Sequence, residues 1–305
     1  MSLNNYYLPK GVELEALLKV LRHLSWGAAD ILLAYARGEQ PPYGFPKALS
    51  IESGGEGPVS AADLAVNAWL IDGFHSSFSE IDWQLLSEET AKDQLANNLP
   101  IDSKWLWILD PLDGTKDFLE GSKDYAVHLG LIKDNQPVLG VVLLPEAEEL
   151  WFGIVGKDCW YENRMGKRSE VCFSNRNKNN ELVLVASKNH RDQKLEEFLE
   201  KLEFIETKKK GSVGCKVASI LRGEADVYIS LSGKSSPKDW DMAAPEALLN
   251  SAGGKFTHAD GRRLKYNSIS SEQRGCLIAT HGKCHDSFCS KAIKALKTVD
   301  PNYSV

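Results

Sequence analysis

Two aspartates, Asp110 and Asp113, follow an almost wholly apolar run and are separated by only two residues in the stretch WILDPLDGT. The run KWLWIL before Asp110 is typical of a buried strand, and Pro111 is expected to stop it. Carboxylates at the carboxyl end of a strand lie where α/β sheets bind ligands, and the free N–H groups of the turn after Gly114 can hold a phosphate. Since magnesium prefers oxygen ligands, the stretch predicts a magnesium site beside a phosphate site. An Asp-Gly pair is also common in plain turns, so Asp113 could merely cap a helix.

Two further acids stand at the ends of expected elements. Glu88 lies in SEET, directly after an expected strand over residues 81–86, and Asp241 lies in DWDMAAPE, at the start of an Ala-rich helix expected over 242–251. Each acid also has a purely structural explanation, because acidic turns are usually solvated and an aspartate N-cap stabilises a helix by about 1 kcal/mol. A strand end and a helix start can also supply metal ligands, so the two readings of Asp241 do not exclude each other.

Three more polar residues are candidates with equally plain alternatives. Asp63 follows Ser60 by three residues at the start of an expected helix, which is nearly a capping box. His190 ends the stretch VASKNH after an expected strand, and it could be a surface loop residue. Lys216 lies inside an apolar helix pattern, where its stem could simply run along the surface and keep the charge in water.

The elements that must position these residues are indicated by hydrophobic periodicity and by Gly and Pro punctuation. Helices are expected over residues 12–37, 60–78, 192–202, 213–222 and 242–251, with a further tail helix, and strands over 81–86, 104–109, 125–132, 138–144, 149–154, 182–186, 204–207, 227–231 and 276–279. The Pro- and Gly-rich stretch 38–58 is expected to be a long loop, of the kind that often forms a functional lid. The polar stretch SNRNKNNE marks an expected boundary between subdomains 1–174 and 175–305. Strands that alternate with helices beyond it indicate an α/β (α+β) fold.

The composition of the 305 residues, 43% hydrophobic and 26% charged, is that of an ordinary globular protein. Two subdomains that share an interface suit this length. A formal net charge of -6 argues against non-specific nucleic-acid binding, which requires a basic excess. No stretch reaches the roughly 18 apolar residues of a membrane span, and the first residues lack a signal-peptide pattern. Together with six cysteines that form no CxxC pair, this predicts a cytoplasmic protein with reduced, mostly buried thiols.

Three motifs in this order, SEE, DPLDGTKDF and WDxAAPE followed by AGG, resemble those of the inositol monophosphatase superfamily, from about Pro58 to Ala279. That group contains lithium-sensitive, magnesium-dependent phosphatases. The resemblance implies a layered αβαβα sandwich whose metal site lies between two subdomains.

The resemblance also implies how the metal is held. Glu88, Asp110 and the carbonyl of Leu112 would hold one magnesium ion, and Asp110, Asp113 and Asp241 would hold a second, with two or three ions per site. Paired metals suit phosphate-ester hydrolysis, because one can activate water while the other stabilises the leaving oxygen.

Catalytic and substrate-binding roles are implied in the same way. The Thr115 hydroxyl and Asp63 would orient and deprotonate the attacking water. His190 and Lys216 would meet the second phosphate or the sugar of the substrate. The substrate-binding residues that the resemblance implies are Gly114, Thr115, His190, Lys216 and Asp241.

Within the superfamily, the chain is most similar to the 3'(2'),5'-bisphosphate nucleotidases, on the Lys and the acid of DPLDGTKDF and on the stretches VASKNH, GSVGCK and PKDWDMAAPE. The implied reaction converts adenosine 3',5'-bisphosphate to AMP and phosphate, so that the partner is a small phosphorylated nucleotide. A monomer is favoured, and a homodimer is possible. The alternative is an inositol monophosphatase or a fructose-1,6-bisphosphatase on the same fold. A regulator that binds nucleotide or metal without catalysis is a more distant one, because every expected carboxylate is present.

Overall fold

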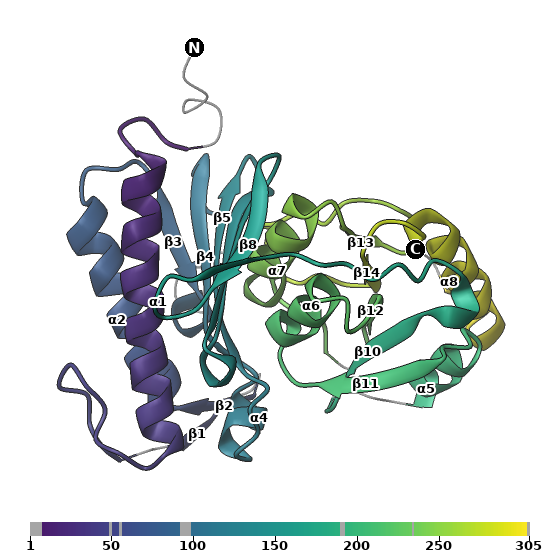
Figure 1. The fold of residues 1–305 in the computed structure, drawn as a ribbon, viewed down its shortest axis with the longest axis horizontal. Coiled ribbons are helices and arrows are strands. Elements are labelled where there is room, and N and C mark those ends of the chain that lie inside the picture. Colours follow the sequence, from purple (N-terminus) through teal and green to yellow (C-terminus); the bar gives the residue numbers. More distant parts are fainter. Residues whose placement is uncertain are drawn as a thin grey trace.

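Helices and sheets alternate in five layers, helix–sheet–helix–sheet–helix (Figure 1). The computed structural model describes residues 8–48, 51–54, 57–91, 99–189, 193–233 and 235–303, with the backbone alone for 51–54, 57, 58 and 179. The helices of the three helical layers, taken pair by pair, are α1 (Leu14–Ala36) and α2 (Ala61–Phe78), α6 (Val213–Leu221) and α7 (Asp239–Ser251), and α5 (Gln193–Glu200) and α8 (His285–Val299). The predicted αβαβα layering is confirmed.

The first sheet has seven strands in the order β3-β4-β5-β6-β7-β8-β9, which is also their order along the chain. β3 and β4 are parallel, and every later pair is antiparallel. Asp134 and Asn135, which join β5 to β6, both have positive φ, as the favoured two-residue hairpin turn requires. The strands are β3 (Gln84–Ser87), β4 (Trp105–Asp113), β5 (Ala126–Lys133), β6 (Gln136–Leu144), β7 (Glu149–Ile154), β8 (Asp158–Glu162) and β9 (Arg168–Glu170).

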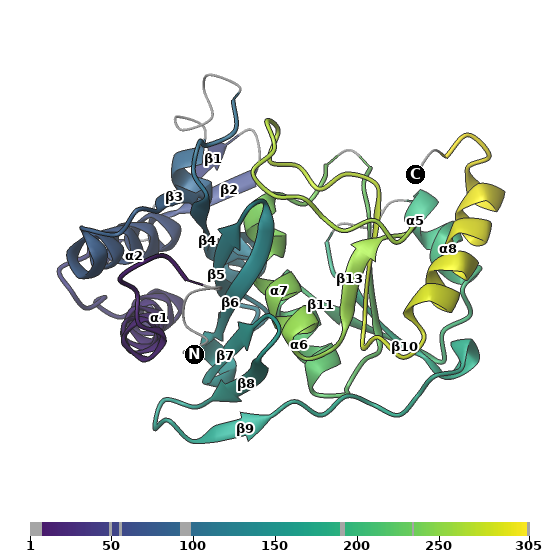
Figure 2. The same cartoon turned by 90° about the horizontal axis from the view of Figure 1, so that it is seen from above.

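The second sheet has five strands in the order β11-β10-β12-β14-β13. β10 is parallel to β11 and β12, whereas β14 is antiparallel to β12 and β13. The connection that leaves β9 runs along one side of the molecule from the first sheet to the second (Figure 2). The strands are β10 (Val183–Ser187), β11 (Glu206–Lys210), β12 (Val227–Leu231), β13 (Lys255–His258) and β14 (Cys276–Thr280).

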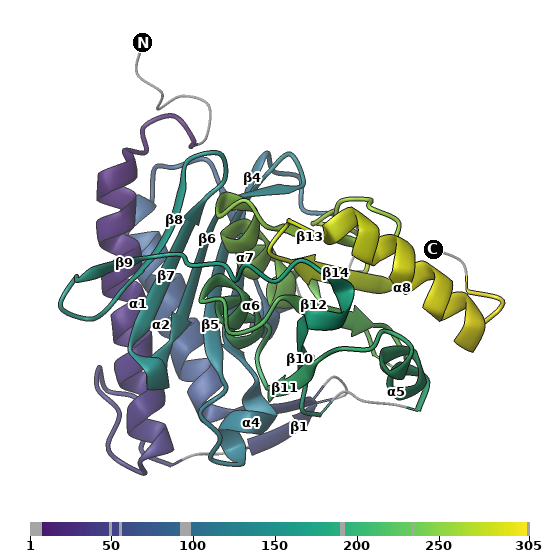
Figure 3. The same ribbon diagram turned by 45° about the vertical axis from the view of Figure 1, so that its right-hand side comes forward.

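A small antiparallel pair, β1 (Ile51–Gly54) and β2 (Gly57–Ser60), stands apart from both sheets and leads directly into α2. It lies beside the short helix α4 (Thr115–Leu119) at one end of the molecule (Figure 3). The prediction that all of residues 38–58 form a loop was therefore wrong for the part that pairs as strands.

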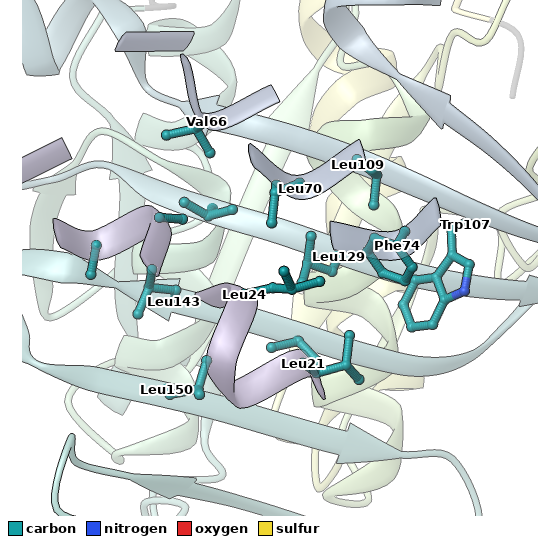
Figure 4. Close-up of a cluster of buried hydrophobic side chains, with 14 of the residues drawn as sticks. Leu21, Leu24, Val66, Leu70, Phe74, Trp107, Leu109, Leu129, Leu143 and Leu150 are labelled. Carbon is teal, nitrogen blue, oxygen red and sulfur yellow. The ribbon is translucent and has the colours of Figure 1, made fainter. Parts of the chain in front are cut away.

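The first apolar core lies between α1, α2 and the first sheet. Leu21 and Leu24 of α1 and Leu70 and Phe74 of α2 meet the inner side chains of the sheet, among them the fully buried Trp107 (Figure 4). The ring centroids of Phe74 and Trp107 are 4.9 Å apart. The leucines of α1 recur every three or four residues, so one face of the helix covers the sheet.

A second core joins the two halves of the chain. Side chains of α6 and α7 pack both against β4, β5 and β6 of the first sheet and against strands of the second. A third core lies between the second sheet and helices α5 and α8. Helices α6 and α7, which lie after residue 174, thus complete the core of a sheet that lies before it. The division into subdomains 1–174 and 175–305 stays a prediction.

Three glycines lie side by side on the first sheet where α7 crosses it. Gly130 of β5 pairs with Gly140 of β6, which in turn pairs with Gly153 of β7. A Cβ on Gly140 would lie 2.4 Å from the carbonyl oxygen of Ala244, and a Cβ on Gly153 would lie 2.7 Å from the Cα of Leu248. The backbone of α7 can approach the sheet this closely only because these three positions carry no side chain.

The other predicted helices and strands are present, with bounds that differ by a few residues. β8, β9 and β13 are not among the predicted strands, and α7 begins at Asp239 rather than at residue 242. All six cysteines are free thiols, five of them buried and Cys172 exposed, which confirms the prediction of mostly buried thiols. Within the described ranges, no helix is both long enough and apolar enough to cross a membrane.

Candidate active site

Three carboxylates meet where β4 ends and α7 begins. Asp110 and Asp113 belong to the end of β4, and Asp241 lies in the first turn of α7. Each offers an oxygen within 4.8 Å of those of the other two. In the part of the chain that the structure describes, these are the one set of three or more His, Cys, Asp or Glu side chains close enough to share a metal ion. The fold therefore brings together three of the four predicted metal-binding carboxylates.

A bulge in β4 places both aspartates on one side of the sheet. Asp110 pairs with His128 of β5 and Asp113 pairs with Ala126, so three steps along β4 match two along β5. In a regular strand, residues three apart point to opposite faces, and the extra residue turns Asp113 back to the side of Asp110. Pro111 lies inside the bulge, where a proline is tolerated. The prediction that Pro111 stops the strand was wrong, because the bulge accommodates it.

Asp110 is buried, and only one of its oxygens has a protein partner. Its Oδ1 accepts a hydrogen bond from the N–H of Leu112 at 3.0 Å, whereas its buried Oδ2 has no hydrogen-bond partner among the described residues. Burial, followed by the charges of Glu88, Asp113 and Asp241, raises the pKa of Asp110 well above its usual range. Burial and the charge of Asp113 likewise raise the pKa of Asp241 to about 7.

This set of donors fits a divalent cation. A buried carboxylate oxygen without a partner, close to other carboxylates that repel it, is costly unless a positive charge is nearby. Every donor in the set is a carboxylate oxygen, which suits magnesium and does not suit softer metals. The cluster is thus built for a divalent metal, and the kind and number of ions belong to the proposal below.

Glu88 stands beside this cluster. It opens the short 3-10 helix η2 (Glu88–Thr90) directly after β3, which is parallel to β4. Because Ser87 pairs with Leu109, Glu88 stands level with Asp110 at the carboxyl edge of the sheet. Burial, with the charges of nearby carboxylates, raises its pKa well above the usual range. Glu88 lies outside the set of three described above, so its role as a ligand stays a prediction.

Asp63 and Thr115 form a hydrogen-bonded pair. The Thr115 hydroxyl lies 2.8 Å from Oδ1 of Asp63 and 3.1 Å from the carbonyl oxygen of Leu112. The other carboxylate oxygen, Oδ2, accepts a hydrogen bond from the N–H of Ser60 at 2.9 Å and completes a capping box at the start of α2. Burial raises the pKa of Asp63, although hydrogen bonds from Ser60 and Thr115 oppose this. The capping box predicted at Asp63 is thus confirmed, and the other carboxylate oxygen faces Thr115. The catalytic role of Asp63 stays a prediction.

Gly114 makes the turn that presents Thr115. Its φ of 95° and ψ of 35° lie in the left-handed region, and a Cβ there would lie 3.0 Å from the carbonyl oxygen of Asp124. Only glycine adopts this conformation without strain in so tight a space. The helical turn predicted after Gly114 is confirmed as α4.

The structure shows contacts to Asp113 from residues that the sequence did not connect with the site. Its Oδ2 accepts hydrogen bonds from the hydroxyl of Ser212 at 2.7 Å and from the N–H of Val213 at 2.6 Å. The buried His128 places Nε2 3.4 Å from the same oxygen, and burial lowers the pKa of this imidazole. The serine before an apolar helix signals an N-cap, which Ser212 also provides to Cys215, but nothing in the sequence connects it with Asp113.

Lys216 is buried, with 2% of its surface exposed. Its ammonium donates a hydrogen bond to the carbonyl oxygen of Gly211 and lies 5.2 Å from the centre of the Tyr228 ring. Burial lowers the pKa of Lys216, against the opposing charge of Asp113 and other groups. The reading in which Lys216 keeps its charge in water was therefore wrong. His190 lies outside the described residues.

A layered αβαβα sandwich with a carboxylate cluster at the edge of its first sheet and a hydroxyl–carboxylate pair beside it suits a phosphatase, an enzyme of the hydrolase class. Comparisons with known proteins agree. The model of the inositol monophosphatase family matches residues 13–297. The chain is 32% identical over 211 residues to the 3'(2'),5'-bisphosphate nucleotidase CysQ of Salmonella typhimurium, which covers 69% of this chain and 80% of the relative. It is 30% identical over 246 residues to CysQ of Escherichia coli O6:H1, which covers 80% and 91%.

A solved IMPase/NADP phosphatase in complex with Mg2+ and phosphate shares the fold, with a TM-score of 0.71 at 17% identity, over 91% of this chain and 95% of that one. The chain belongs to the inositol monophosphatase family.

Proposed function

We propose that this protein is a magnesium-dependent 3'(2'),5'-bisphosphate nucleotidase that converts adenosine 3',5'-bisphosphate to AMP and phosphate with water as the nucleophile. The observation that carries the proposal is the carboxylate cluster with the partnerless Oδ2 of Asp110, next to the Thr115–Asp63 pair. The nucleotide as substrate is supported by relatives of about 30% identity that bear this name.

In this proposal, Asp110, Asp113 and Asp241 hold the metal, together with Glu88 and the carbonyl oxygen of Leu112, and the site takes two or three ions. When bound, magnesium supplies positive charge that lowers the pKa of the attacking water and balances the charge on the phosphate oxygens. The protein contributes fixed donors: the bulge in β4 sets Asp110 and Asp113, and the first turn of α7 sets Asp241.

Asp63 would act as the general base through Thr115. A hydroxyl has one proton to donate and two lone pairs that accept. With its proton donated to Oδ1 of Asp63, the Thr115 oxygen is free to accept a hydrogen bond from the attacking water. The proton of this water can pass through Thr115 to Asp63. Burial raises the pKa of Asp63, which makes it a stronger base than an exposed aspartate.

Lys216 would receive the second phosphate of the substrate. Its buried ammonium has a carbonyl oxygen and an aromatic ring as partners, and no carboxylate lies within 4.0 Å of it among the described residues. Its charge is thus left for an anionic ligand. His190, Gly114 and Asp241 complete the proposed substrate contacts.

The proposal extends to the protein's surroundings. Six free thiols suit a reducing compartment such as the cytoplasm. A monomer is the expected state, which size-exclusion chromatography with light scattering would check.

The test is phosphate release in the presence of Mg2+, with adenosine 3',5'-bisphosphate, inositol 1-phosphate and fructose 1,6-bisphosphate compared at equal concentrations. We expect kcat/KM for the nucleotide to exceed the others by at least about a hundredfold, which is about 2.7 kcal/mol of transition-state discrimination. A profile led by inositol 1-phosphate or fructose 1,6-bisphosphate would overturn the substrate assignment. Absence of turnover with all three would overturn the catalytic role.

A further inference from the structure

Asp117, the acid of the DPLDGTKDF run, is not among the carboxylates that meet at the metal cluster. It lies in α4, two residues after Thr115, and is 4% exposed. Its Oδ2 accepts a hydrogen bond from the side-chain amide of Asn189 at 3.1 Å, and its Oδ1 lies 3.6 Å from the ammonium of Lys188. Both partners directly follow β10, a strand of the second sheet. A buried carboxylate next to the metal-bearing segment is thus held by the other half of the fold.

Asp124, which precedes β5 on the same segment, has partners of the same kind. Its Oδ1 accepts a hydrogen bond from Nζ of Lys210 at 3.1 Å, and its Oδ2 forms an ion pair with Lys188. Burial would raise the pKa of Asp124, but the hydrogen bonds and charges of the two lysines outweigh it and lower the pKa. Lys188 therefore bridges Asp117 and Asp124. We call these two aspartates, with Lys188 and Lys210, the seat network.

The backbone next to the seat network is in direct contact with the same segment. The N–H of Ser212 donates a hydrogen bond to the carbonyl oxygen of Asp124 at 3.1 Å. A Cβ on Gly211 would lie 2.5 Å from the carboxyl group of Asp117 and 2.5 Å from the carbonyl oxygen of Asp124. Gly211 therefore packs against both aspartates with no room for a side chain.

The segment that rests on the seat network carries groups of the active site. Ser212 and Val213 donate two hydrogen bonds to Asp113. The ammonium of Lys216 donates to the carbonyl oxygen of Gly211, the residue that packs on the two aspartates. A shift of residues 210–213 would consequently move Lys216 relative to the carboxylate cluster.

We propose that Asp117 and Asp124 are positioning residues, which hold residues 210–216 against the metal-bearing segment and thereby fix the Lys216 ammonium for the second anionic group of the substrate. The inference deepens the proposed function and rests on it for the identity of that anionic group. It gives the acid of DPLDGTKDF a role in substrate affinity and no role in binding metal. Ion pairs that served the fold alone would change stability and leave substrate affinity untouched.

The first experiment compares Asp117→Asn and Asp124→Asn with wild type on two nucleotides, adenosine 3',5'-bisphosphate and adenosine 3'-monophosphate, which lacks the second phosphate. We expect KM for the bisphosphate to rise at least about tenfold, because small displacements of a positioned group are costly, and KM for the monophosphate to change far less. Asp124→Glu, which keeps the charge, should restore part of the loss. Lys209→Gln is the matched control, because Lys209 is exposed on the same strand as Lys210 and should leave both KM values unchanged.

Two further measurements do not depend on turnover. Amide hydrogen exchange of residues 210–216 should become at least about tenfold faster in both Asn variants and stay unchanged in Lys209→Gln. Mg2+ binding followed by calorimetry should change less than KM for the bisphosphate, since neither aspartate is among the proposed ligands and the bulge in β4 still sets Asp113. If Asp117→Asn does not fold, Lys188→Gln removes the same bridge without placing a new group in the buried position.

Each outcome decides one question. Faster exchange without a change in KM for the bisphosphate, or lower melting temperatures alone, would overturn the positioning role. An equal rise of KM for both nucleotides would overturn the connection with the second phosphate. If the wild-type protein hydrolyses neither nucleotide, the proposed function fails, and unchanged exchange of residues 210–216 in both Asn variants would separately overturn the seat network.

Discussion

Asp63 divides its two carboxylate oxygens between a helix cap and a hydroxyl of the active site. At this third helical position, the amide oxygen of an asparagine can still accept the hydrogen bond from the N–H of Ser60, but an asparagine cannot accept a proton. We therefore expect Asp63→Asn to lower kcat at least about a hundredfold, in the range typical for loss of a general base. The melting temperature and Mg2+ affinity should stay close to wild type. Steady-state kinetics, calorimetry and thermal melting of one preparation provide the test.

Ser60→Ala is the matched control for Asp63→Asn. It removes a hydroxyl from the same capping box and leaves the carboxylate in place. This variant should lose about 1 kcal/mol of stability and keep most of its turnover. If Asp63→Asn lost stability and activity in the same proportion as Ser60→Ala, Asp63 would be a cap and nothing more.

Glu246 of α7 is buried, and it accepts hydrogen bonds from the hydroxyl of Tyr266 and the amide of Asn250. Burial raises its pKa from the ordinary 4.5 to about 7. The folded state thus binds this proton more tightly than the unfolded state, so the contribution to stability is complete below pH 4.5 and is lost as the pH rises through about 7. Between pH 4.5 and about 7, the free energy of unfolding of the wild type should therefore fall by up to about 1.4 kcal/mol per pH unit because of this one group. We expect Glu246→Gln to lack this fall.

Urea unfolding of wild type and Glu246→Gln between about pH 5 and pH 8 measures this difference, since one pKa unit corresponds to about 1.4 kcal/mol. Glu206→Gln, at an exposed position on β11, is the control and should leave the pH dependence of wild type unchanged. Parallel curves for wild type and Glu246→Gln would show that Glu246 is charged in the folded protein at every pH tested.

At the active site, what could be read from the sequence was the residue types at strand and helix ends. Asp110, Asp113 and Asp241 are acids at such ends, and the structure places them together. The contact of Ser212 with Asp113 could not be read, because a hydrogen bond between residues 99 positions apart leaves no periodic pattern. The contact of His128 with Asp113 depends on how β5 pairs with β4, which the sequence does not show. The roles of all these residues in binding metal or substrate stay predictions.

At the scale of elements, the glycine row Gly130, Gly140 and Gly153 sets how closely α7 approaches the first sheet. A methyl group at Gly140 would meet the carbonyl oxygen of Ala244, which is backbone and cannot be removed by substitution. We expect Gly140→Ala to lower the free energy of unfolding by about 1–3 kcal/mol or more, because either α7 or β6 must move. Chemical denaturation would measure the loss.

A double variant distinguishes this explanation from a general preference of strands for or against glycine. The nearest atom to a Cβ at Gly130 is the Cβ of Ala243, at 2.8 Å. Gly130→Ala should therefore be partly rescued by Ala243→Gly, whereas Gly140→Ala should not be rescued by Ala244→Gly. Equal behaviour of the two pairs would mean that close packing of α7 is not the cause.

Elements with a regular apolar face were predicted with small errors in their bounds. α1, α2, β5, β6 and β7 have such faces, and they form the first core with the inner residues of β4. β9 has three residues, none of them buried, so no alternation of apolar and polar residues could mark it. The length of β4 was missed because Pro111 is a strand breaker by local rules, and only the pairing with β5 shows the bulge that tolerates it.

At the scale of the whole molecule, the carboxylates of the active site oppose the stability of the metal-free protein. We expect Asp110→Asn to raise the melting temperature in the presence of a chelator, because it removes one of several repelling charges in a buried place. In saturating Mg2+ the order should reverse, since binding to the folded state at 100 times Kd contributes about 2.7 kcal/mol. Differential scanning calorimetry with EDTA and with Mg2+ tests both expectations.

Asp158→Asn serves as the control, because Asp158 is an acid of the first sheet that pairs with Arg168 at the surface, away from β4. It should leave the response to Mg2+ unchanged. If Mg2+ stabilised Asp110→Asn as much as wild type, the cluster would not be the place where the ion binds.

The placement of α6 and α7 over the first sheet also constrains the order in which the protein can mature during synthesis. All strands of that sheet have been synthesised once Glu170 is made, but α7 begins only at Asp239. Until then, the apolar face of the nascent sheet that carries the row of glycines lacks α7, the helix that packs on those glycines. An arrested chain that ends before α7 would thus expose apolar surface to chaperones and proteases. Synthesis of α7 completes the core of the first sheet and supplies Asp241 to the carboxylate cluster at the same time.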